Sequence, residues 1–254
     1  MLFRSVAGYW RALALPYQAT MQALGGDLYV RKVTLEYEGS ARYDEQIDVG
    51  IRCARIGNSS MRLQAAVFRG EQRLVHGELV YIFADPGSQT AQPVPPALRA
   101  VLTGFEAGES MLDVRTGDWA ALGAEAGAIR DAVFIQEQGI AAALEHDAAD
   151  STALHAVAYN RLGLALGTGR LLSSGAGTAK IGRMAVLASL RGAGIGRPLL
   201  DALVNAARER GDREVVLHAQ SSAVGFYLRA GFALRGPAFE EAGIAHQEMT
   251  LSLR

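Results

Sequence analysis

A glycine-rich segment from Arg191 to Gly196 has the residue types of an anion-binding turn. It follows an apolar stretch that ends at Val186, and Pro198 stands where the first turn of a helix is expected. Proline is tolerated there because the first helical residues have no intrahelical acceptor for their N–H groups. Glycines let backbone amides converge, helix N-termini attract negative charge, and the flanking Arg191 and Arg197 suit a pyrophosphate. The segment therefore predicts a phosphate-binding turn.

The spacing within this turn separates three classes of phosphate-binding motif. A P-loop requires Gly-Lys-Ser/Thr at its end, which is missing. A Rossmann motif requires a glycine where Arg197 stands and an acidic residue at the end of the next strand, whereas Glu214 begins that strand. The pattern that remains, Arg191-x-x-Gly194-x-Gly196, resembles the acyl-CoA-binding motif of the GNAT N-acyltransferases. A turn with only a packing role is the alternative.

The sequence around the turn strengthens this resemblance. The segments "VFIQEQGI", "EHDAAD", "GTGRL", "AKIGRMAV", "LHAQ" and "GFYLRAGF" occur in the order of one GNAT subfamily, between residues 111 and 254. The resemblance implies acetyl-CoA or another acyl-CoA as co-substrate. It also implies that the backbone of one strand binds the pantetheine arm and that the turn binds the pyrophosphate. The implied residues are Met184, Ala185 and Val186 in the strand and Arg191, Gly192, Ala193, Gly194, Ile195, Gly196 and Arg197 in the turn.

Direct acyl transfer to an amine needs a neutral nucleophile, a polarised thioester carbonyl and a proton for the departing thiolate. The resemblance implies that Tyr227 in "GFYLRAGF" is the proton donor, with a core aromatic as the alternative. The resemblance places Glu137 and Gln138 at the family's acceptor site, and Glu137 is one candidate for the general base. Asp147, His218 and His246 remain open as alternatives, because a carboxylate or an imidazole can accept the proton directly or through water.

The second half of the chain is expected to be an α+β domain with a mixed sheet. Its pattern predicts strands, helices and a hairpin that alternate along residues 111–254. We expect a strand over 111–116, a helix from the cap Asp118 to about 136, a hairpin over 154–172, a strand over 179–186, a helix over 195–210, a strand over 214–219, a helix over 223–230 and closing strands over 232–236 and 246–253.

The first half of the chain predicts one long helix followed by an antiparallel sheet. The helix is expected over residues 3–24, and strands are expected over 28–37, 47–53, 61–67 and 73–83. This pattern resembles the hotdog fold of the 4-hydroxybenzoyl-CoA-type thioesterases over residues 1–85. Prolines and small polar residues between 84 and 96 predict that residues 86–110 are a linker with a short connecting helix.

The hotdog resemblance lacks the first strand and the catalytic aspartate that precede the helix in that family. Three explanations remain open: a domain for dimerisation or acyl-CoA binding, a start codon assigned too late, or another acidic residue such as Asp27 in that role. Because such sheets would otherwise leave a long exposed edge, a homodimer through this domain is expected.

Composition limits the partners and cofactors. The 254 residues carry a net charge of −1, which favours neither nucleic acid nor an anionic membrane as a partner. Cys53 is the sole cysteine and the five histidines lack ligand spacing, so we expect no disulfide and no metal. No apolar run reaches the length of a membrane span, and a cytoplasmic location is expected.

Together the patterns predict an acyl-CoA-dependent N-acyltransferase. Its acceptor is expected to be a small-molecule amine or a protein amine. An acyl-CoA thioesterase and a non-catalytic acyl-CoA-binding scaffold are the alternatives.

Overall fold

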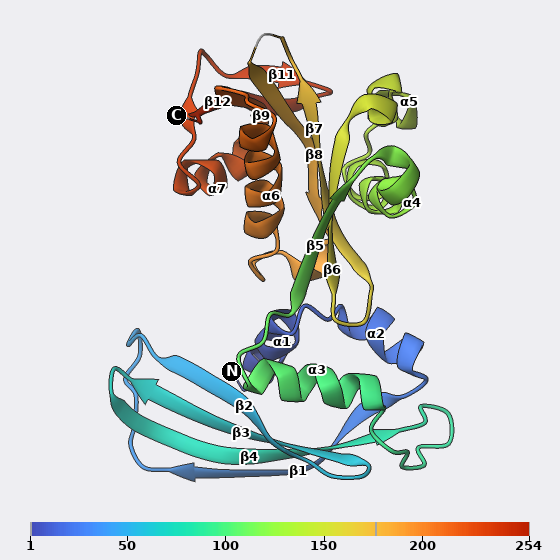
Figure 1. The fold of residues 1–254 in the computed structure, drawn as a ribbon. Helices are drawn as coiled ribbons and strands as arrows, with labels where there is room; N and C mark the ends of the chain where they lie inside the picture. The colour runs from blue at the N-terminus through green and yellow to red at the C-terminus, as the bar shows by residue number, and fades with distance from the viewer. Residues whose placement is uncertain (1, 176, 254) are drawn as a thin grey trace. The chain divides into compact units, whose positions relative to one another are not determined.

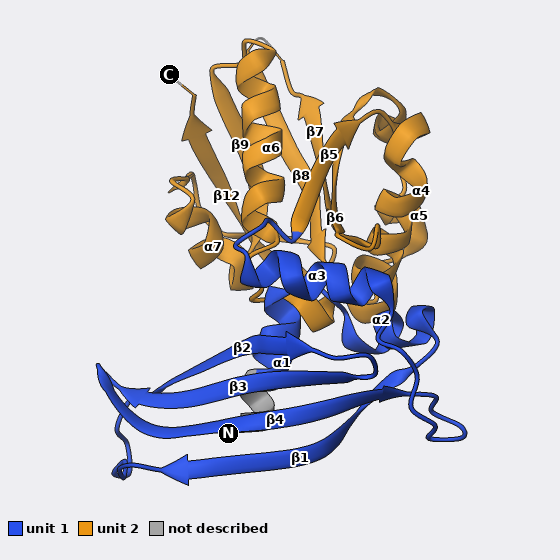
Figure 2. Cartoon of the chain, turned by 60° about the horizontal axis from the view of Figure 1, so that its bottom comes forward, with its two compact units in different colours: residues 1–111 blue, residues 112–254 orange. Residues whose placement is uncertain are grey.

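The computed structural model describes residues 2–175 and 177–253, and it divides into two compact units. The first unit comprises Met1–Met111 and the second comprises Leu112–Arg254 (Figure 2). Each unit has its own sheet, so each is described separately (Figure 1).

The first unit combines a curved antiparallel sheet with helices. The sheet order is β1-β4-β3-β2, and every neighbouring pair is antiparallel. Alternating residues of β3 and β4, such as Leu63 and Leu79, are buried, as the alternation in the sequence predicts. The elements are α1 (Leu2–Ala12), α2 (Tyr17–Leu24), β1 (Asp27–Tyr37), β2 (Asp48–Ile56), β3 (Ser60–Arg69), β4 (Gln72–Ala84) and α3 (Pro96–Glu106).

The single N-terminal helix expected over residues 3–24 is wrong in one respect, because it is broken into α1 and α2. Ala14 has a positive φ of 54°, a left-handed conformation that ends α1. Pro16 caps α2 with an extended backbone, and the residue before a proline is itself disfavoured in a helix. The hydrophobic pattern continues through the break, so periodicity alone could not reveal it.

Helix α3, expected in a linker, is packed into the first unit. Leu98, Val101 and Leu102 are buried. Arg99 donates hydrogen bonds to the carbonyl oxygens of Ile56 and Gly57 at 3.1 and 2.6 Å. The amphipathic face of α3 is therefore part of the core of this unit, and the proline-rich composition before it did not reveal that.

The second unit has the mixed sheet that the sequence predicts. Its strand order is β10-β12-β9-β8-β7-β6-β5, with β11 paired to β12. The β8–β9 pair is parallel, and the other neighbouring pairs are antiparallel. The strands are β5 (Leu112–Gly117), β6 (Leu154–Asn160), β7 (Ala165–Ser173), β8 (Thr178–Val186), β9 (Glu214–Gln220), β10 (Ala233–Leu234), β11 (Phe239–Glu241) and β12 (Ile244–Ser252).

Helices lie on both sides of this sheet (Figure 1). Figure 1 shows α6 and α7 on one side and α4 and α5 on the other. The helical elements are α4 (Trp119–Arg130), the π-helix η1 (Asp131–Glu137), α5 (Ala142–Glu145), the 3₁₀ helix η2 (Ala148–Thr152), the 3₁₀ helix η3 (Ala188–Leu190), α6 (Gly196–Glu209), the 3₁₀ helix η4 (Ser221–Ala223) and α7 (Val224–Arg229).

Two glycines of β7 let α6 approach the sheet closely. A Cβ atom at Gly167 would lie 2.9 Å from Cδ1 of Leu199, and one at Gly169 would lie 2.8 Å from Cδ1 of Leu203. Both leucines are fully buried. The segment "GTGRL" therefore fixes the distance between β7 and the helix that begins at the glycine-rich turn.

The helix expected from the cap Asp118 changes its geometry before it ends. The Asp118 carboxylate accepts a hydrogen bond from the amide of Ala121 at 2.9 Å, which confirms the predicted cap. After Arg130 the chain continues as the π-helix η1, whose wider turn carries Glu137 and is followed by Gln138. Such π-helical turns often occur at functional sites.

Candidate active site

The glycine-rich turn presents backbone amides without acceptors. Among the described residues, the N–H groups of Gly192, Gly194, Ile195 and Gly196 donate no hydrogen bond. Gly192 and Gly194 have φ values of 82° and 83°, which glycine adopts without strain. A Cβ atom at either position would meet no atom within 4 Å, so the turn is open. Free amides at the start of α6 can bind an anion, as the sequence predicts.

Strands β8 and β9 separate beside this turn. Their parallel pairing extends from Thr178–Glu214 to Ile181–Leu217 and then stops. A β-bulge, in which Gly169 of β7 is skipped and Arg183 has a φ of 53°, bends β8 at this point. Ala185 and Val186 therefore pair with β7 on one side, Met184 lies in the bulge, and none of the three pairs with β9. Their free edge can bind an extended ligand through backbone hydrogen bonds.

Glu137 and Arg191, predicted to have separate roles, form an ion pair. The Nη1 and Nη2 atoms of Arg191 donate to the two carboxylate oxygens of Glu137 at 2.6 and 2.7 Å, and Nε donates to the carbonyl oxygen of Val186. The hydrogen bonds from Arg191 hold the pKa of the Glu137 carboxyl below its usual value. A carboxylate with a lowered pKa is a weaker general base.

Tyr227 is buried, with an exposed fraction of 7%. Its ring packs edge-on against Phe226 and Phe232. Its hydroxyl makes no hydrogen bond to another described residue, and burial raises the pKa of the phenol to about 12. The group therefore stays protonated at neutral pH and can donate a proton, although its packing also fits the core role that the sequence left open.

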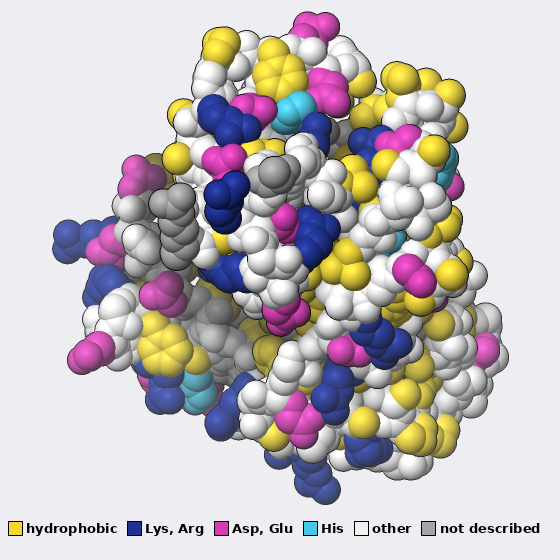
Figure 3. Space-filling model, turned by 45° about the horizontal axis from the view of Figure 1, so that its top comes forward, with side chains coloured by type: hydrophobic (Ala, Val, Ile, Leu, Met, Phe, Trp, Pro, Cys, Tyr) yellow, Lys and Arg dark blue, Asp and Glu magenta, His cyan; other side chains and the backbone are white. Residues whose placement is uncertain are grey.

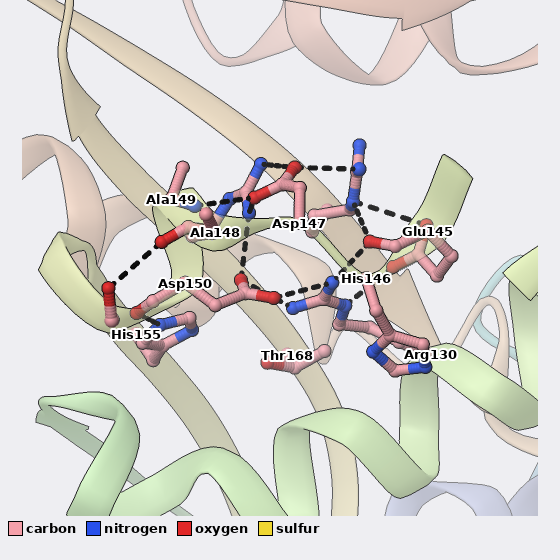
Figure 4. A network of polar contacts seen from close by, with 12 residues as sticks. Arg130, Glu145, His146, Asp147, Ala148, Ala149, Asp150, His155 and Thr168 are labelled. Atoms are coloured by element: carbon pink, nitrogen blue, oxygen red, sulfur yellow. Dashed lines mark hydrogen bonds and ion pairs between the residues drawn. The ribbon is translucent and has the colours of Figure 1, made fainter. Parts of the chain in front are cut away.

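A buried network of alternating charges holds α4, α5 and η2 to strand β7 (Figure 4). Arg130 donates to Glu145 at 2.5 Å and to both carboxylate oxygens of Asp150 at 2.8 and 3.1 Å. Arg170 binds Asp147 through two hydrogen bonds of 2.6 and 2.9 Å and shares Asp150 at 2.7 Å. The buried members Arg130, Glu145, Asp150 and Arg170 compensate one another, which is the condition for stable burial, whereas Asp147 is 38% exposed.

Arg183, the bulge residue of β8, joins the same network. Its guanidinium lies 3.1 Å from Glu145 and 3.1 Å from Asp147. Asp147, a candidate base, is therefore bound by two arginines, and the hydrogen bonds from Arg170 lower the pKa of its carboxyl. The "EHDAAD" and "GTGRL" segments thus form a scaffold beside the separated strands.

A polar cluster whose partners the sequence did not predict lies beside the separated strands β8 and β9. Gln138, which follows η1, and Gln220, the last residue of β9, are joined by amide hydrogen bonds, the shorter being 2.9 Å. Two residues before Gln220, His218 binds Glu241 of β11 at 2.9 Å. The only sequence signal was the run of polar residues in "LHAQ" and "HQEM", which does not specify partners.

The described residues contain no group of three or more histidine, cysteine, aspartate or glutamate side chains placed to hold a metal ion. Within the same residues, no helix is both long and apolar enough to cross a membrane. Acidic and basic side chains are interspersed over the face shown in Figure 3.

Comparison with known proteins identifies the class. The family described as the acetyltransferase (GNAT) domain matches residues 120–253, just over half of the chain. The chain therefore belongs to the GNAT acetyltransferases, and its second unit is an acetyltransferase domain with the GNAT fold.

Particular relatives agree with this family. The uncharacterized N-acetyltransferase YjcF of Bacillus subtilis (strain 168) is 36% identical over 122 residues, which are 48% of this chain and 86% of that protein. A crystal structure of a Lactobacillus plantarum protein matches with a TM-score of 0.54 and 30% identity, covering 57% of this chain and 100% of that one. Escherichia coli ElaA matches with a TM-score of 0.50 and 25% identity, covering 55% and 99%.

The family gives the co-substrate in general terms. GNAT acyltransferases use acetyl-CoA or another acyl-CoA and act on amine acceptors. The open amides of the turn and the free edge of β8 fit the pyrophosphate and the amide-containing arm of such a co-substrate.

Proposed function

We propose that the protein transfers an acyl group, foremost the acetyl group, from CoA directly to an amine. The single observation that carries this proposal is the set of unpartnered amides at Gly192, Gly194, Ile195 and Gly196, which lie beside the free edge of β8. The amides and the positive charges of Arg191 and Arg197 bind the pyrophosphate. The backbone of Met184–Val186 binds the arm, with the thioester beyond it toward Gly182.

The transfer needs one carbon–nitrogen bond to form and one carbon–sulfur bond to break. The neutral amine attacks the thioester carbonyl, the thiolate leaves, and Tyr227 gives its hydroxyl proton to the sulfur. The amide nitrogen returns a proton to the tyrosinate, so Tyr227 ends unchanged. A phenol whose pKa is raised to about 12 by burial is a protonated donor throughout the neutral range.

Glu137 acts, in this proposal, by positioning Arg191. Its carboxylate is engaged by two hydrogen bonds from that guanidinium, and its pKa is lowered. It therefore holds Arg191 beside the turn until a pyrophosphate competes for it. The expectation that Glu137 is the general base is replaced by this role.

The first unit is proposed to be a hotdog-like domain for dimerisation or acyl-CoA binding. Val33 and Tyr37 on the edge strand β1 are 43% and 76% exposed, which favours contact with a second copy. A pocket of about 480 Å³ lies at the same end of the sheet, lined by Leu35, Ile47, Val67 and Leu74 among others. Its apolar walls suit an acyl chain.

The free Cys53 thiol fits the reducing cytoplasm that we propose as the location.

An acyl-CoA panel tests the proposal with the full chain. Release of free thiol is measured with acetyl-CoA and longer acyl-CoA thioesters, each with and without primary amines. We expect release that depends on the amine and formation of the N-acyl product by mass spectrometry.

The other outcomes identify the alternatives. Release that does not depend on an amine would show a thioesterase. Acyl-CoA binding without any release would show a scaffold, and either result would overturn the transferase proposal.

A further inference from the structure

His218 occupies the point at which β8 and β9 separate. The last β8–β9 pair is Ile181–Leu217, so His218 is the first residue of β9 beyond the pairing. An arm that follows β8 from Val186 to Gly182 covers four residue steps, about 13 Å. This path leads from the glycine-rich turn to the place where His218 begins the free edge of β9.

The neighbours of His218 fix its tautomer. Nδ1 lies 2.9 Å from Oε2 of Glu241, and a carboxylate there can only accept, so Nδ1 carries the hydrogen and donates it. Nε2 is then the basic nitrogen, and it lies 3.7 Å from a carboxylate oxygen of Glu248. The side chain is 27% exposed, so an acceptor can reach it. One carboxylate orients the ring, and a second lies near the nitrogen that would accept the proton.

His218 and Tyr227 come from opposite sides of the sheet. Alternation along β9 places His218 on the face of Gln220, whose amide bonds to Gln138 after η1. Tyr227 belongs to α7, on the side covered by α6 (Figure 1). Removal of the first proton from the acceptor ammonium by His218 and the relay of the second proton through Tyr227 can therefore occur from two separate sides of the sheet.

The other candidate bases lack the arrangement found at His218, in which a carboxylate is hydrogen-bonded to the ring. Glu137 is bound by Arg191, and Asp147 is bound by Arg170 and Arg183. His246 donates Nδ1–H to the carbonyl oxygen of Ile244, and no carboxylate among the described residues is hydrogen-bonded to its ring.

We propose that His218 is the general base that removes a proton from the acceptor ammonium, with Glu241 as its positioning residue. This inference rests on the proposed acyl transfer. The ammonium gives one proton to Nε2, the freed lone pair forms the carbon–nitrogen bond, and the carbon–sulfur bond breaks. Tyr227 relays the second proton from nitrogen to sulfur, and the imidazolium returns its proton to water.

Charged groups on three strands surround the pair formed by His218 and Glu241. Burial raises the pKa of Glu241, but the hydrogen bond from His218 and the charges of His246 and Lys180 outweigh it and leave that pKa lowered. Glu248 also binds Arg235, and that hydrogen bond lowers the pKa of its carboxyl. Glu241 on β11 and Glu248 on β12 lie beside the His218 ring, and the charges of His246 on β12 and Lys180 on β8 act on Glu241.

The tautomer is testable without any acceptor. Nitrogen-15 chemical shifts of the histidine rings are recorded for the full chain, and the His218 signals are assigned by their loss in His218→Gln. We expect the neutral ring to carry its hydrogen on Nδ1 and to lose that preference in Glu241→Gln. A ring with its hydrogen on Nε2 would overturn the proposal.

The catalytic role is tested by kcat/KM against pH with acetyl-CoA and the primary alkylamine that the wild-type protein acetylates fastest. Loss of a general base predicts a decrease of about 10²-fold or more in His218→Gln near neutral pH. The decrease should shrink toward the pKa of the amine, where the acceptor is neutral without help. Glu241→Gln should lose about 10-fold to 100-fold. A merely structural role would lower the rate equally at every pH.

A matched control is available in the first unit. His76 lies between Glu36 and Glu38, at 3.4 and 3.1 Å, and His76→Gln should leave the profile unchanged. A His218→Gln profile that parallels the wild type, or one in which His246→Gln shows the pH-dependent loss instead, would reject the assignment. If the wild-type protein acetylates no amine at all, the proposed function itself has failed, and the inference fails with it.

Discussion

The carboxylate of Glu137 and the guanidinium of Arg191 lie side by side in a two-pronged ion pair, with hydrogen bonds of 2.6 and 2.7 Å. The pair joins the end of the π-helix η1 to the start of the glycine-rich turn. Both side chains are partly exposed, so the pair can open when a stronger anion approaches. This relationship makes Arg191 a prepositioned cation beside the free amides.

Replacement of Arg191 by alanine should weaken acetyl-CoA binding. Loss of a charge-assisted contact to the pyrophosphate should weaken the binding free energy of acetyl-CoA by about 1.5–3 kcal/mol, as measured by calorimetric titration. S-acetyl-pantetheine, which has no pyrophosphate, should bind the wild-type protein and Arg191→Ala equally. Glu137→Gln should keep acetyl-CoA affinity within about threefold, because the cation remains. An equal loss for both thioesters would contradict a pyrophosphate contact.

A side chain at Gly194 should block the turn. Gly194 has a φ of 83°, and its missing Cβ faces open space beside the amides. In Gly194→Val the strain of about 1–2 kcal/mol and the added bulk should lower acetyl-CoA affinity at least tenfold. Gly163→Val is the control, because Gly163 has a φ of 77° and equally open surroundings in the β6–β7 turn. It should lose similar stability and keep its affinity for acetyl-CoA.

Replacement of Tyr227 by phenylalanine should lower kcat by about 10²-fold and leave acetyl-CoA affinity unchanged. The hydroxyl makes no hydrogen bond to another described residue, so stability in urea should change by less than about 0.5 kcal/mol. Because burial raises the pKa to about 12, Tyr227 should impose no alkaline decrease in kcat below about pH 10. An unchanged kcat would make Tyr227 a packing residue.

The sequence predicted those features that depend on residues close together in the chain. The turn from Arg191 to Gly196, the cap at Asp118 and the alternation in β3 and β4 are all visible in short windows. The broken helix at Ala14 was not predicted, because the apolar pattern of α1 continues into α2. Periodicity reports which face is buried and does not report the backbone angle of one residue.

The contacts within the site depend on pairs that are distant in sequence. Glu137 and Arg191 are 54 residues apart, and Glu137 is the last residue of the π-helix η1, which the sequence did not predict. His218 meets Glu241 because the short strand β11 folds back on β12, and three residues carry too little periodicity to predict. The family resemblance therefore predicted which residues belong to the site. It could not predict which side chains contact one another, because that depends on how the strands pair.

Replacement of Asp150 by asparagine should destabilise the second unit strongly. Asp150 is 5% exposed and compensates both Arg130 and Arg170, so its loss leaves buried positive charge that costs about 3–5 kcal/mol. The control Asp131→Asn removes the exposed pair with His146 and should cost less than about 1 kcal/mol. Urea unfolding followed by circular dichroism compares the two, and equal costs would contradict a compensating role.

The effect of Asp150→Asn should also depend on pH. Burial raises the pKa of Asp150, but hydrogen bonds from Arg130 and Arg170 outweigh it and leave that pKa lowered. The stabilisation is therefore present above the pKa of the unfolded carboxyl, about 4, and is lost as pH falls through the lower folded value. The difference in unfolding free energy between wild type and variant should decrease below about pH 4 and be constant from pH 6 to 8.

The edge strand β1 of the first unit provides a test of the proposed dimer, because neighbouring residues of this strand lie on opposite faces of the sheet. The register pairs Val33 with the fully buried Leu79 and Tyr37 with Val75, so Val33 lies on the face of the sheet that carries the core, yet it is 43% exposed. Thr34, the next residue, lies on the opposite face. If a second copy covers the apolar face, Val33→Lys places a charge in the interface and should shift the full chain to a monomer in light scattering at micromolar concentration. Thr34→Lys adds the same charge on the other face and should leave the dimer intact. A wild-type chain that is monomeric, or dissociation by both variants alike, would contradict an interface on this face.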